Sequence, residues 1–346
     1  MDIIQPDKQL FADICQIIDA ARSRVAVNAN AELTLMHWHI GHRVNTDILG
    51  NQRAEYGKQV VATLAKQLQE RFQTNQFSLR SLRRMMQFAE EFPNLEIVTP
   101  LVTQLSWSHF LIVLPIKNET AREFYLTMAA NAHWSKRELN HQIDGMLFER
   151  TAIAGKDNEQ IKQELAQLRN NDVMSPDLVF KNPYFLDFTG LKGYYSERDL
   201  EDMLITGLQR FIMELGSGFS FVERQKRMII DGEDFYLDLL FYHRKLHRLI
   251  AIELKRGKFK AAYKGQMELY LRWLDKYERQ PGEDAPLGLL LCSEGSEEQI
   301  ELLQLDNAGI QVAQYYTELP PKHLIIEQLQ KQIALAKQRI DNRIDE

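Results

Sequence analysis

Residues 234–257 read DFYLDLLFYHRKLHRLIAIELKRG, in which two apolar runs flank the polar segment HRKLHR. Each run has the length and the aliphatic and aromatic content of a buried β-strand, and the polar segment between them indicates a hairpin turn. Asp238 interrupts the first run, and Glu253 and Lys255 interrupt the second. The stretch therefore predicts two adjacent strands that carry two acids and a base into an apolar core.

The spacing of these three charged residues predicts that they meet. Glu253 and Lys255 share one face of their strand, because successive side chains of a strand point to opposite faces. Asp238 precedes Glu253 by 15 residues, which is the separation that a hairpin needs to bring two strand positions side by side. Burying a charge is costly unless it is paired or bound. The stretch is therefore either an edge strand with a structural Glu–Lys pair or the wall of a site that needs both charges.

The second interpretation has a definite chemistry. Two carboxylates on adjacent strands can hold a hard divalent cation through oxygen ligands, and a lysine on the same face can orient an attacking water. Phosphodiester hydrolysis requires these parts, because the cation neutralises the charge that develops on the phosphate. We therefore predict that Asp238 and Glu253 bind Mg²⁺, or Mn²⁺ as its substitute, and that Lys255 positions the water.

The length and composition are those of a two-domain globular protein. The chain has 346 residues, of which 45% are apolar and 26% charged, and its formal net charge is −6. No apolar run approaches the roughly 20 residues that span a bilayer, and the N-terminus has no secretory signal pattern. Cys15 and Cys292 lie outside any CxxC spacing, which argues against a disulfide framework or a cysteine zinc site. We expect a cytoplasmic protein without membrane segments.

Hydrophobic periodicity predicts the organisation of the chain. The N-terminal part has helical spacing throughout, with Ser78 and Ser135 as N-caps. The C-terminal part combines an amphipathic helix at 197–216 with four strands and a strand–helix–strand crossover. The fold class is thus α + α/β, an all-helical domain followed by a central mixed β-sheet flanked by helices. The predicted boundaries are 1–150 for the helical domain, 151–176 for a linker, 177–325 for the sheet domain and 326–346 for a C-terminal helix.

Basic residues are clustered in spite of the negative net charge. Arg80, Arg83 and Arg84 lie at the start of a predicted helix, where a DNA-recognition helix places its contacting residues. Arg256 and Lys258 directly follow the charged strand. Each cluster alone is more often a solvated face. We nevertheless predict these five residues as candidate nucleic-acid contacts, because a binding protein needs a local basic footprint and not a high overall charge.

Several segments carry a family resemblance. They are GEDFYLDLLFYHRKLHRLIAIELKRGKFKAAYKGQMELYLRWLD (232–275), HWHIGHRV (37–44), FSLRSLRRMMQFAEEFP (77–93) and LSWSHFLIVL (105–114). The chain closely resembles the YhcG-like family of bacterial PD-(D/E)XK nucleases, here with Leu237–Asp238 in place of Pro–Asp. The resemblance implies a helical N-terminal domain joined to a restriction-endonuclease-like domain.

The resemblance also implies two further site residues. Gln266, on the helix after the second strand, would bond a metal-bound water or a phosphate. Glu201, on the helix before the strands, would supply another carboxylate, with Glu197 as a rival for that role. For Glu201, a simple surface position is an equal alternative, because acids are common in the first turn of a helix.

Other motifs do not support a rival chemistry. His37, His39 and His42 look like metal ligands, but His37 and His39 point apart on a helix and no acid stands at a companion position. The sequence contains no Walker A motif, no GxGxxG after a strand and no GxSxG elbow. An ATP-driven enzyme or a serine hydrolase is therefore poorly supported.

The hypothesis that follows is a magnesium-dependent nuclease acting on DNA, in repair, recombination or defence against foreign DNA. Its helical domain would grip the substrate or mediate assembly. Two alternatives are a nuclease-fold scaffold that binds without cleaving and an enzyme that cleaves RNA, since a 2′-hydroxyl would be read by pocket shape. The intact acids, lysine and glutamine argue against a decayed scaffold. The sequence leaves open the preferred nucleic-acid structure and whether the chain forms a homo-oligomer.

Overall fold

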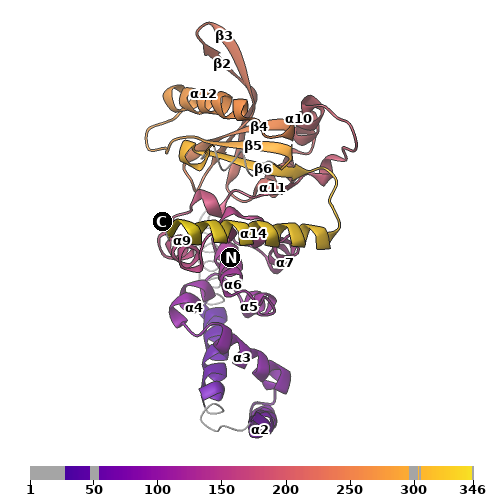
Figure 1. Cartoon of the computed structure of the whole chain (residues 1–346). Coiled ribbons are helices and arrows are strands. Elements are labelled where there is room, and N and C mark those ends of the chain that lie inside the picture. Colours follow the sequence, from indigo (N-terminus) through magenta and orange to yellow (C-terminus); the bar gives the residue numbers. More distant parts are fainter. Residues whose placement is uncertain (1–27, 47–53, 296–302, 304, 345–346) are drawn as a thin grey trace, which may run out of the picture. The chain divides into compact units, whose positions relative to one another are not determined.

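The computed structural model describes residues 28–46, 54–295, 303 and 305–344 (Figure 1). Its contacts divide the chain into two compact units, Met1–Gly145 and Met146–Glu346, and each is described here by itself. Cys15 and the part of the first predicted helix that precedes residue 28 lie outside the described residues.

The first unit is helical throughout its described residues, as predicted. Its N-caps are those that the sequence indicates: Ser78 accepts a hydrogen bond from the Ser81 backbone N–H (3.3 Å), and Ser135 accepts one from the Glu138 N–H (3.2 Å). The helices span 28–46, α2 Ala54–Phe72, α3 Leu79–Glu91, α4 Leu95–Val102, α5 Trp107–Val113, α6 Glu119–Asn131 and α7 Lys136–Asp144. Helix α6 is buried along nearly its whole length.

The second unit is built on a six-stranded mixed sheet of order β1-β6-β5-β4-β3-β2. Strands β2, β3 and β4 are antiparallel neighbours, whereas β4, β5, β6 and β1 run parallel. The strands span β1 Tyr184–Phe185, β2 Phe219–Ile230, β3 Glu233–His243, β4 Arg248–Lys258, β5 Leu287–Glu294 and β6 Ile310–Tyr316. The β2–β3 hairpin projects beyond the rest of the sheet (Figure 1).

Helices cover this sheet as the predicted fold class requires. Helix α12 (Ala261–Tyr277) makes the predicted crossover from β4 to β5, and its Met267 and Leu274 pack with Ala251 of β4. The predicted helix at 197–216 is wrong in one respect, because Gly207 separates α10 (Glu197–Thr206) from α11 (Leu208–Leu215). The remaining helices are α8 Leu147–Arg150, α9 Asn158–Asn171 and α14 Lys322–Ile344.

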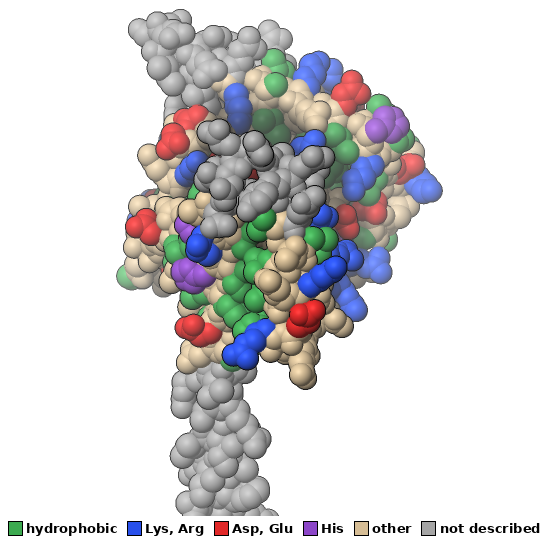
Figure 2. Space-filling model, turned by 90° about the horizontal axis from the view of Figure 1, so that it is seen from below, with side chains coloured by type: hydrophobic (Ala, Val, Ile, Leu, Met, Phe, Trp, Pro, Cys, Tyr) green, Lys and Arg blue, Asp and Glu red, His purple; other side chains and the backbone are tan. Residues whose placement is uncertain are grey.

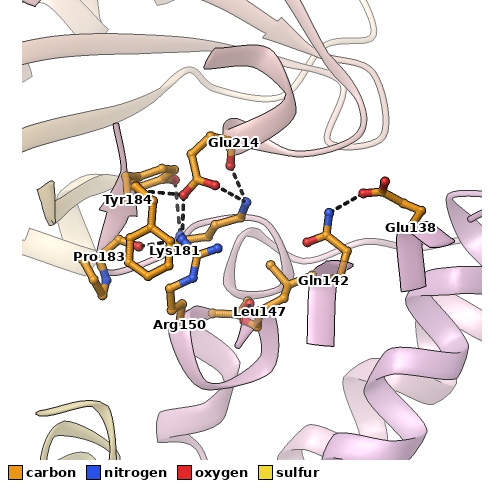
Figure 3. A network of polar contacts seen from close by, with 10 residues as sticks. Glu138, Gln142, Leu147, Arg150, Lys181, Pro183, Tyr184 and Glu214 are labelled. Carbon is orange, nitrogen blue, oxygen red and sulfur yellow. Dashed lines mark hydrogen bonds and ion pairs between the residues drawn. The ribbon is translucent and has the colours of Figure 1, made fainter. Parts of the chain in front are cut away.

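A buried polar network holds α11 to the segment before the sheet (Figure 3). The Glu214 carboxylate receives a hydrogen bond from Arg150 Nη1 (2.6 Å) and another from the Phe185 backbone N–H (2.8 Å). Lys181 Nζ donates to the Glu214 carbonyl oxygen. Burial alone would raise the pKa of Glu214, but the charges of Lys181 and Arg150 outweigh it and lower that pKa. The network therefore fixes one edge of the unit through paired buried charges.

The surface combines both signs of charge. On the face drawn in Figure 2, lysine and arginine side chains lie among acidic, uncharged and apolar ones. None of the helices that the structure describes is long and apolar enough to cross a bilayer.

Candidate active site

The site lies where β3 and β4 separate. Their ladder runs from His243↔Arg248 to Leu239↔Ile252, and Asp238 and Glu253 are the next two positions. There a side chain replaces the ladder bond, because the Asp238 backbone N–H donates to Glu253 Oε1 (3.3 Å). The Asp238 carboxylate in turn accepts the Leu254 backbone N–H at Oδ2 (2.9 Å). The two predicted acids therefore face one another at the point where the strands diverge.

Lys255 completes the predicted trio. Its Nζ donates to Glu253 Oε2 (2.6 Å), and only 11% of the lysine side chain and 3% of the glutamate side chain are exposed. The Lys255 ammonium also lies 5.4 Å from the centre of the Tyr263 ring on α12. Glu253 and Lys255 alternate with Leu254 and share the strand face of Ala251, which packs against α12. The charged pair is therefore covered by the sheet domain and is not an exposed edge pair.

Burial dominates the electrostatics of these groups. Desolvation, followed by the nearby charge of Asp238, raises the pKa of Glu253 to about 7, against the opposing effect of Lys255. Desolvation likewise raises the pKa of Asp238, although the Leu254 N–H and the Lys255 charge oppose it. For Lys255, burial lowers the pKa, but the attraction of Glu253 and Asp238 is stronger and the net shift is upward. The lysine is thus held charged beside two carboxyl groups whose ionisation is costly.

Helix α10 contributes a third buried carboxylate. Glu201 has 7% of its side chain exposed and forms an ion pair with Arg224, which also pairs with Asp202. The Glu201 charge is one of the causes that raise the pKa of Asp238, so the two carboxylates are neighbours. The structure therefore gives Glu201 a buried position toward the site and not the surface position that was its alternative.

Gln225, on β2, is a site residue that sequence reasoning missed. The β2–β3 register puts it opposite Asp238. Its Nε2 donates to Glu201 Oε2 (2.8 Å) and to Asp238 Oδ1 (3.2 Å), so one amide bridges two carboxylates. Its backbone φ is 49°, a left-handed conformation that residues other than glycine rarely adopt. A glutamine in a strand carries no signal of such a role, because the register with Asp238 cannot be read from β2 alone.

Gln266, predicted as a further site residue, contacts a tyrosine near the trio. Gln266 is half-buried on α12, and its Nε2 donates to Tyr270 Oη (2.7 Å). Burial raises the pKa of Tyr270, and the charges of Glu253, Lys255 and Asp238 also act on it. Gln266 thus reaches the trio through a tyrosine.

Glu197, the rival candidate to Glu201, lies at the start of α10 next to the end of β4. Its Oε1 accepts the Arg256 backbone N–H (2.8 Å), and its charge helps to raise the pKa of Lys255. Its side chain is exposed, unlike that of Glu201. Glu197 therefore fixes the end of β4, and Glu201 is the acid that lies beside Asp238.

The candidate nucleic-acid contacts fall in both units. Arg80, Arg83 and Arg84 are exposed on α3 of the first unit, whereas Arg256 and Lys258 lie at the end of β4. His37, the first residue of the histidine motif, is buried against Trp107 with its ring centre 4.7 Å from that of the tryptophan. Burial lowers the pKa of His37, as expected for a core histidine.

The donor set of the site suits a hard divalent cation. Three elements supply carboxylate oxygens, from Glu201, Asp238 and Glu253, and oxygen ligands are what Mg²⁺ and Mn²⁺ prefer. Within the described ranges, no three His, Cys, Asp or Glu side chains already surround a common point at metal-binding distance. The Gln225 amide lies between Glu201 and Asp238, so a cation shared by these two acids would displace its NH₂ group.

Comparison with known proteins identifies the family of the chain. Residues 13–150 match the family model described as the DUF1016 N-terminal domain, and residues 177–334 match that of the YhcG PDDEXK nuclease domain. The Escherichia coli (strain K12) protein named "Putative nuclease YhcG" is 32% identical in an alignment 354 positions long, which covers 93% of each chain. The chain belongs to the YhcG nuclease family. The predicted fold class is confirmed by the helical first unit, the mixed sheet and the match to the nuclease domain.

Two solved structures resemble parts of this YhcG-family chain. One is a repair endonuclease from Pyrococcus abyssi, with 20% identity, a TM-score of 0.27 and coverage of 38% of this chain and 50% of the other. The second is an EndoMS–dsDNA2 complex, with 19% identity, a TM-score of 0.27 and coverage of 38% and 48%. The matched region is thus about half of the length of those structures.

Proposed function

We propose that this nuclease hydrolyses phosphodiester bonds in DNA with Mg²⁺ as its metal and Mn²⁺ as a substitute. The observation that carries the proposal is the convergence of Asp238, Glu253 and Lys255 where β3 and β4 part, with Glu201 beside them. A bound divalent cation supplies charge neutralisation at the phosphate and a more acidic water. The acids Asp238, Glu253 and Glu201 would hold it.

Lys255 has the properties that a water-positioning residue needs. Its raised pKa keeps it an ammonium, and its Nζ already donates to Glu253 (2.6 Å), so its direction is fixed. From there it can donate to a water that approaches the phosphate or to a phosphate oxygen on which negative charge develops. Gln266 would assist indirectly by orienting the hydroxyl group of Tyr270.

Stability alone gives little reason to keep such a site. Glu253 is almost fully buried and its pKa is raised to about 7, so its ionised form destabilises the fold at neutral pH. A scaffold that only binds nucleic acid through surface cations would not need buried carboxylates. Perturbed acids in contact with a lysine are typical of catalytic sites. This contrast favours an enzyme over a decayed nuclease fold.

The test is cleavage of a panel of substrates. Linear, nicked, single-stranded and branched DNA and an RNA control would be incubated with Mg²⁺ or Mn²⁺, and again with a chelator. The variants are Glu253→Gln and Lys255→Ala, with Glu233→Gln as the matched control, since Glu233 is an exposed acid on the same hairpin as Asp238. We expect metal-dependent DNA cleavage that both site variants lose and the control keeps.

The other possible results each change a different part of the proposal. Cleavage that persists with chelator, or at the wild-type rate in both site variants, would remove the assigned site. Binding without cleavage under every condition would instead support the scaffold. Cleavage of RNA alone would keep the chemistry and change the substrate.

A further inference from the structure

An exposed aromatic ring stands beside the candidate active site. Tyr194 is 86% exposed, which is unusual for so large an apolar ring. The guanidinium carbon of Arg256 lies 3.7 Å from the centre of this ring. Arg256 directly follows Lys255 on β4, and Glu197 links the two, since its carboxylate accepts the Arg256 N–H and its charge acts on Lys255. The ring is therefore tied to the strand that carries the chemistry.

The two members of the pair are held in place from both sides. The Arg256 backbone N–H donates to Glu197 Oε1 (2.8 Å) at the start of α10. The residue after Tyr194 is anchored as well, because Tyr195 Oη donates to Tyr315 Oη (3.4 Å). The Arg256 guanidinium also lies 5.7 Å from the centre of the Tyr195 ring. An exposed side chain would ordinarily be free to move, but here the backbone of its stacking partner and the side chain of the next residue are both hydrogen-bonded.

The fold itself gains little from this arrangement. A cation–π pair at an exposed site contributes little to stability. Burying the aromatic ring would contribute more, yet Tyr194 remains outside the core. One face of the ring is taken by Arg256, and the high exposure leaves the opposite face open to solvent. The open face is thus available to a planar group from another molecule.

The neighbouring charges favour a nucleic acid as that molecule. Lys192, Arg198 and Lys258 are exposed close to the pair in the chain. Glu197 accepts the Arg256 N–H and Asp199 accepts the N–H and hydroxyl group of its own helix cap, whereas the exposed Glu294 stands opposite Lys258 in the β4–β5 register. Aromatic rings with arginine beside them are the usual platforms on which bases of single strands stack.

We propose that Tyr194, backed by Arg256, is a stacking platform for an unpaired base of the strand that enters the site. The bases of an intact duplex stack on one another and do not offer a free face at the side of the helix. The platform therefore assigns the substrate class as nucleic acid with at least one unpaired nucleotide next to the scissile bond. This inference rests on the proposed nuclease function for its location but makes a claim about binding alone.

Binding can be tested without cleavage. Fluorescence anisotropy would measure the affinity of the full chain for a labelled single strand and for the same strand annealed to its complement as a blunt-ended duplex, first with chelator and then with Ca²⁺. The variants are Tyr194→Ala, which removes the ring, and Tyr194→Phe, which keeps it. Tyr277→Ala is the matched control, because Tyr277 is 59% exposed and has Lys276 Nζ at 4.9 Å from its ring centre at the far end of α12.

Stacking on an aromatic ring contributes about 1–3 kcal/mol per base, so Tyr194→Ala should weaken single-strand binding by roughly 5- to 150-fold. Tyr194→Phe and Tyr277→Ala should stay within about twofold of the wild type, and duplex binding should not change in any variant. The wild type should bind a single strand with abasic positions more weakly than it binds the intact strand. Tyr194→Ala should bind the two strands equally well.

The outcomes separate this inference from the nuclease proposal. Equal single-strand binding by the wild type and Tyr194→Ala overturns the platform, as does an equal loss for single strand and duplex. A wild type that binds no single strand, with chelator or with Ca²⁺, also overturns it. If Tyr194→Ala selectively loses single-strand binding but the wild type cleaves no substrate, the platform stands and the nuclease proposal fails. If Tyr194→Ala cleaves and binds single strands as well as the wild type, the nuclease proposal stands and the platform fails.

Discussion

Substitution of Glu253 by glutamine should remove a loss of stability that the wild type shows as pH rises. Glu253 has an ordinary pKa of 4.5 and a folded-state pKa of about 7, chiefly because burial opposes its ionisation. Below pH 4.5 both states carry the proton and the group contributes nothing. As pH rises, the unfolded chain ionises first, so the folded state loses stability until the pH exceeds 7. Glutamine has no proton to lose and removes this decline.

The expected size follows from the shift. Each pKa unit corresponds to about 1.4 kcal/mol, so the wild type loses about 3 kcal/mol by pH 8 and about 1 kcal/mol by pH 5. For a unit of this size, 1 kcal/mol moves the midpoint of thermal unfolding by about 2–4 °C. The midpoint of thermal unfolding of Glu253→Gln, relative to that of the wild type, should therefore rise by roughly 4–8 °C between pH 5 and pH 8. Loss of the Lys255 partner adds an offset that does not vary with pH in this range.

The assay is thermal unfolding of the full chain from pH 5 to pH 8, with Glu233→Gln as an exposed control that should match the wild type. Adding Mn²⁺ at pH 8 should raise the midpoint of the wild type more than that of Glu253→Gln, because binding to the folded state stabilises it. A difference between the wild type and Glu253→Gln that stays constant across the pH range would refute the assigned burial of an ionisable carboxylate.

Three further perturbations have expected outcomes. Gln225→Ala removes the amide between two carboxylates, so the Mn²⁺-induced rise in melting temperature should exceed that of the wild type; an equal or smaller rise would contradict the bridging role. Arg150→Met leaves the buried Glu214 carboxylate without the guanidinium 2.6 Å away, so the free energy of unfolding should fall by about 3–5 kcal/mol. Urea titrations measure this loss, and a loss below about 1 kcal/mol would show that water already solvates the pair. Burial lowers the pKa of His243 to about 4, so the wild type should lose up to about 3 kcal/mol relative to His243→Gln as pH falls from 6.5 to 4. Urea titrations of both proteins at each pH measure this difference, and a difference that does not change with pH would contradict the assigned burial of the imidazole.

The sequence was most informative where its signals are local. The strand–turn–strand pattern around HRKLHR and the 15-residue spacing of Asp238 and Glu253 predicted which side chains meet, because a hairpin fixes register over a short distance. The start of α3 at Leu79 followed from the Ser78 cap in the same way. These predictions depend on neighbours in the chain, and the structure brings the side chains together as expected.

Features set by distant parts of the chain escaped prediction. Strand β1 is only two residues long, so it has no sequence pattern of its own, and its pairing with β6 spans more than a hundred residues. The role of Gln225 depends on a left-handed backbone conformation in a strand and on the register of β2 with β3. Gly207 divides α10 from α11 although the apolar spacing continues through it, because periodicity does not report a change in helix direction.

The parting of β3 and β4 has a consequence for how this nuclease can tolerate insertions. Between Leu239 and His243 every position of β3 is matched to β4, so a single inserted residue there would turn Asp238 to the opposite face. Beyond that point, residues 233–237 of β3 are paired with β2 alone in the described chain. The tip of that hairpin can therefore lengthen or shorten by matched pairs without moving a carboxylate. Relatives should vary in length at the turn around Gly232 and keep constant the five matched pairs that lead from Asp238 to the next turn.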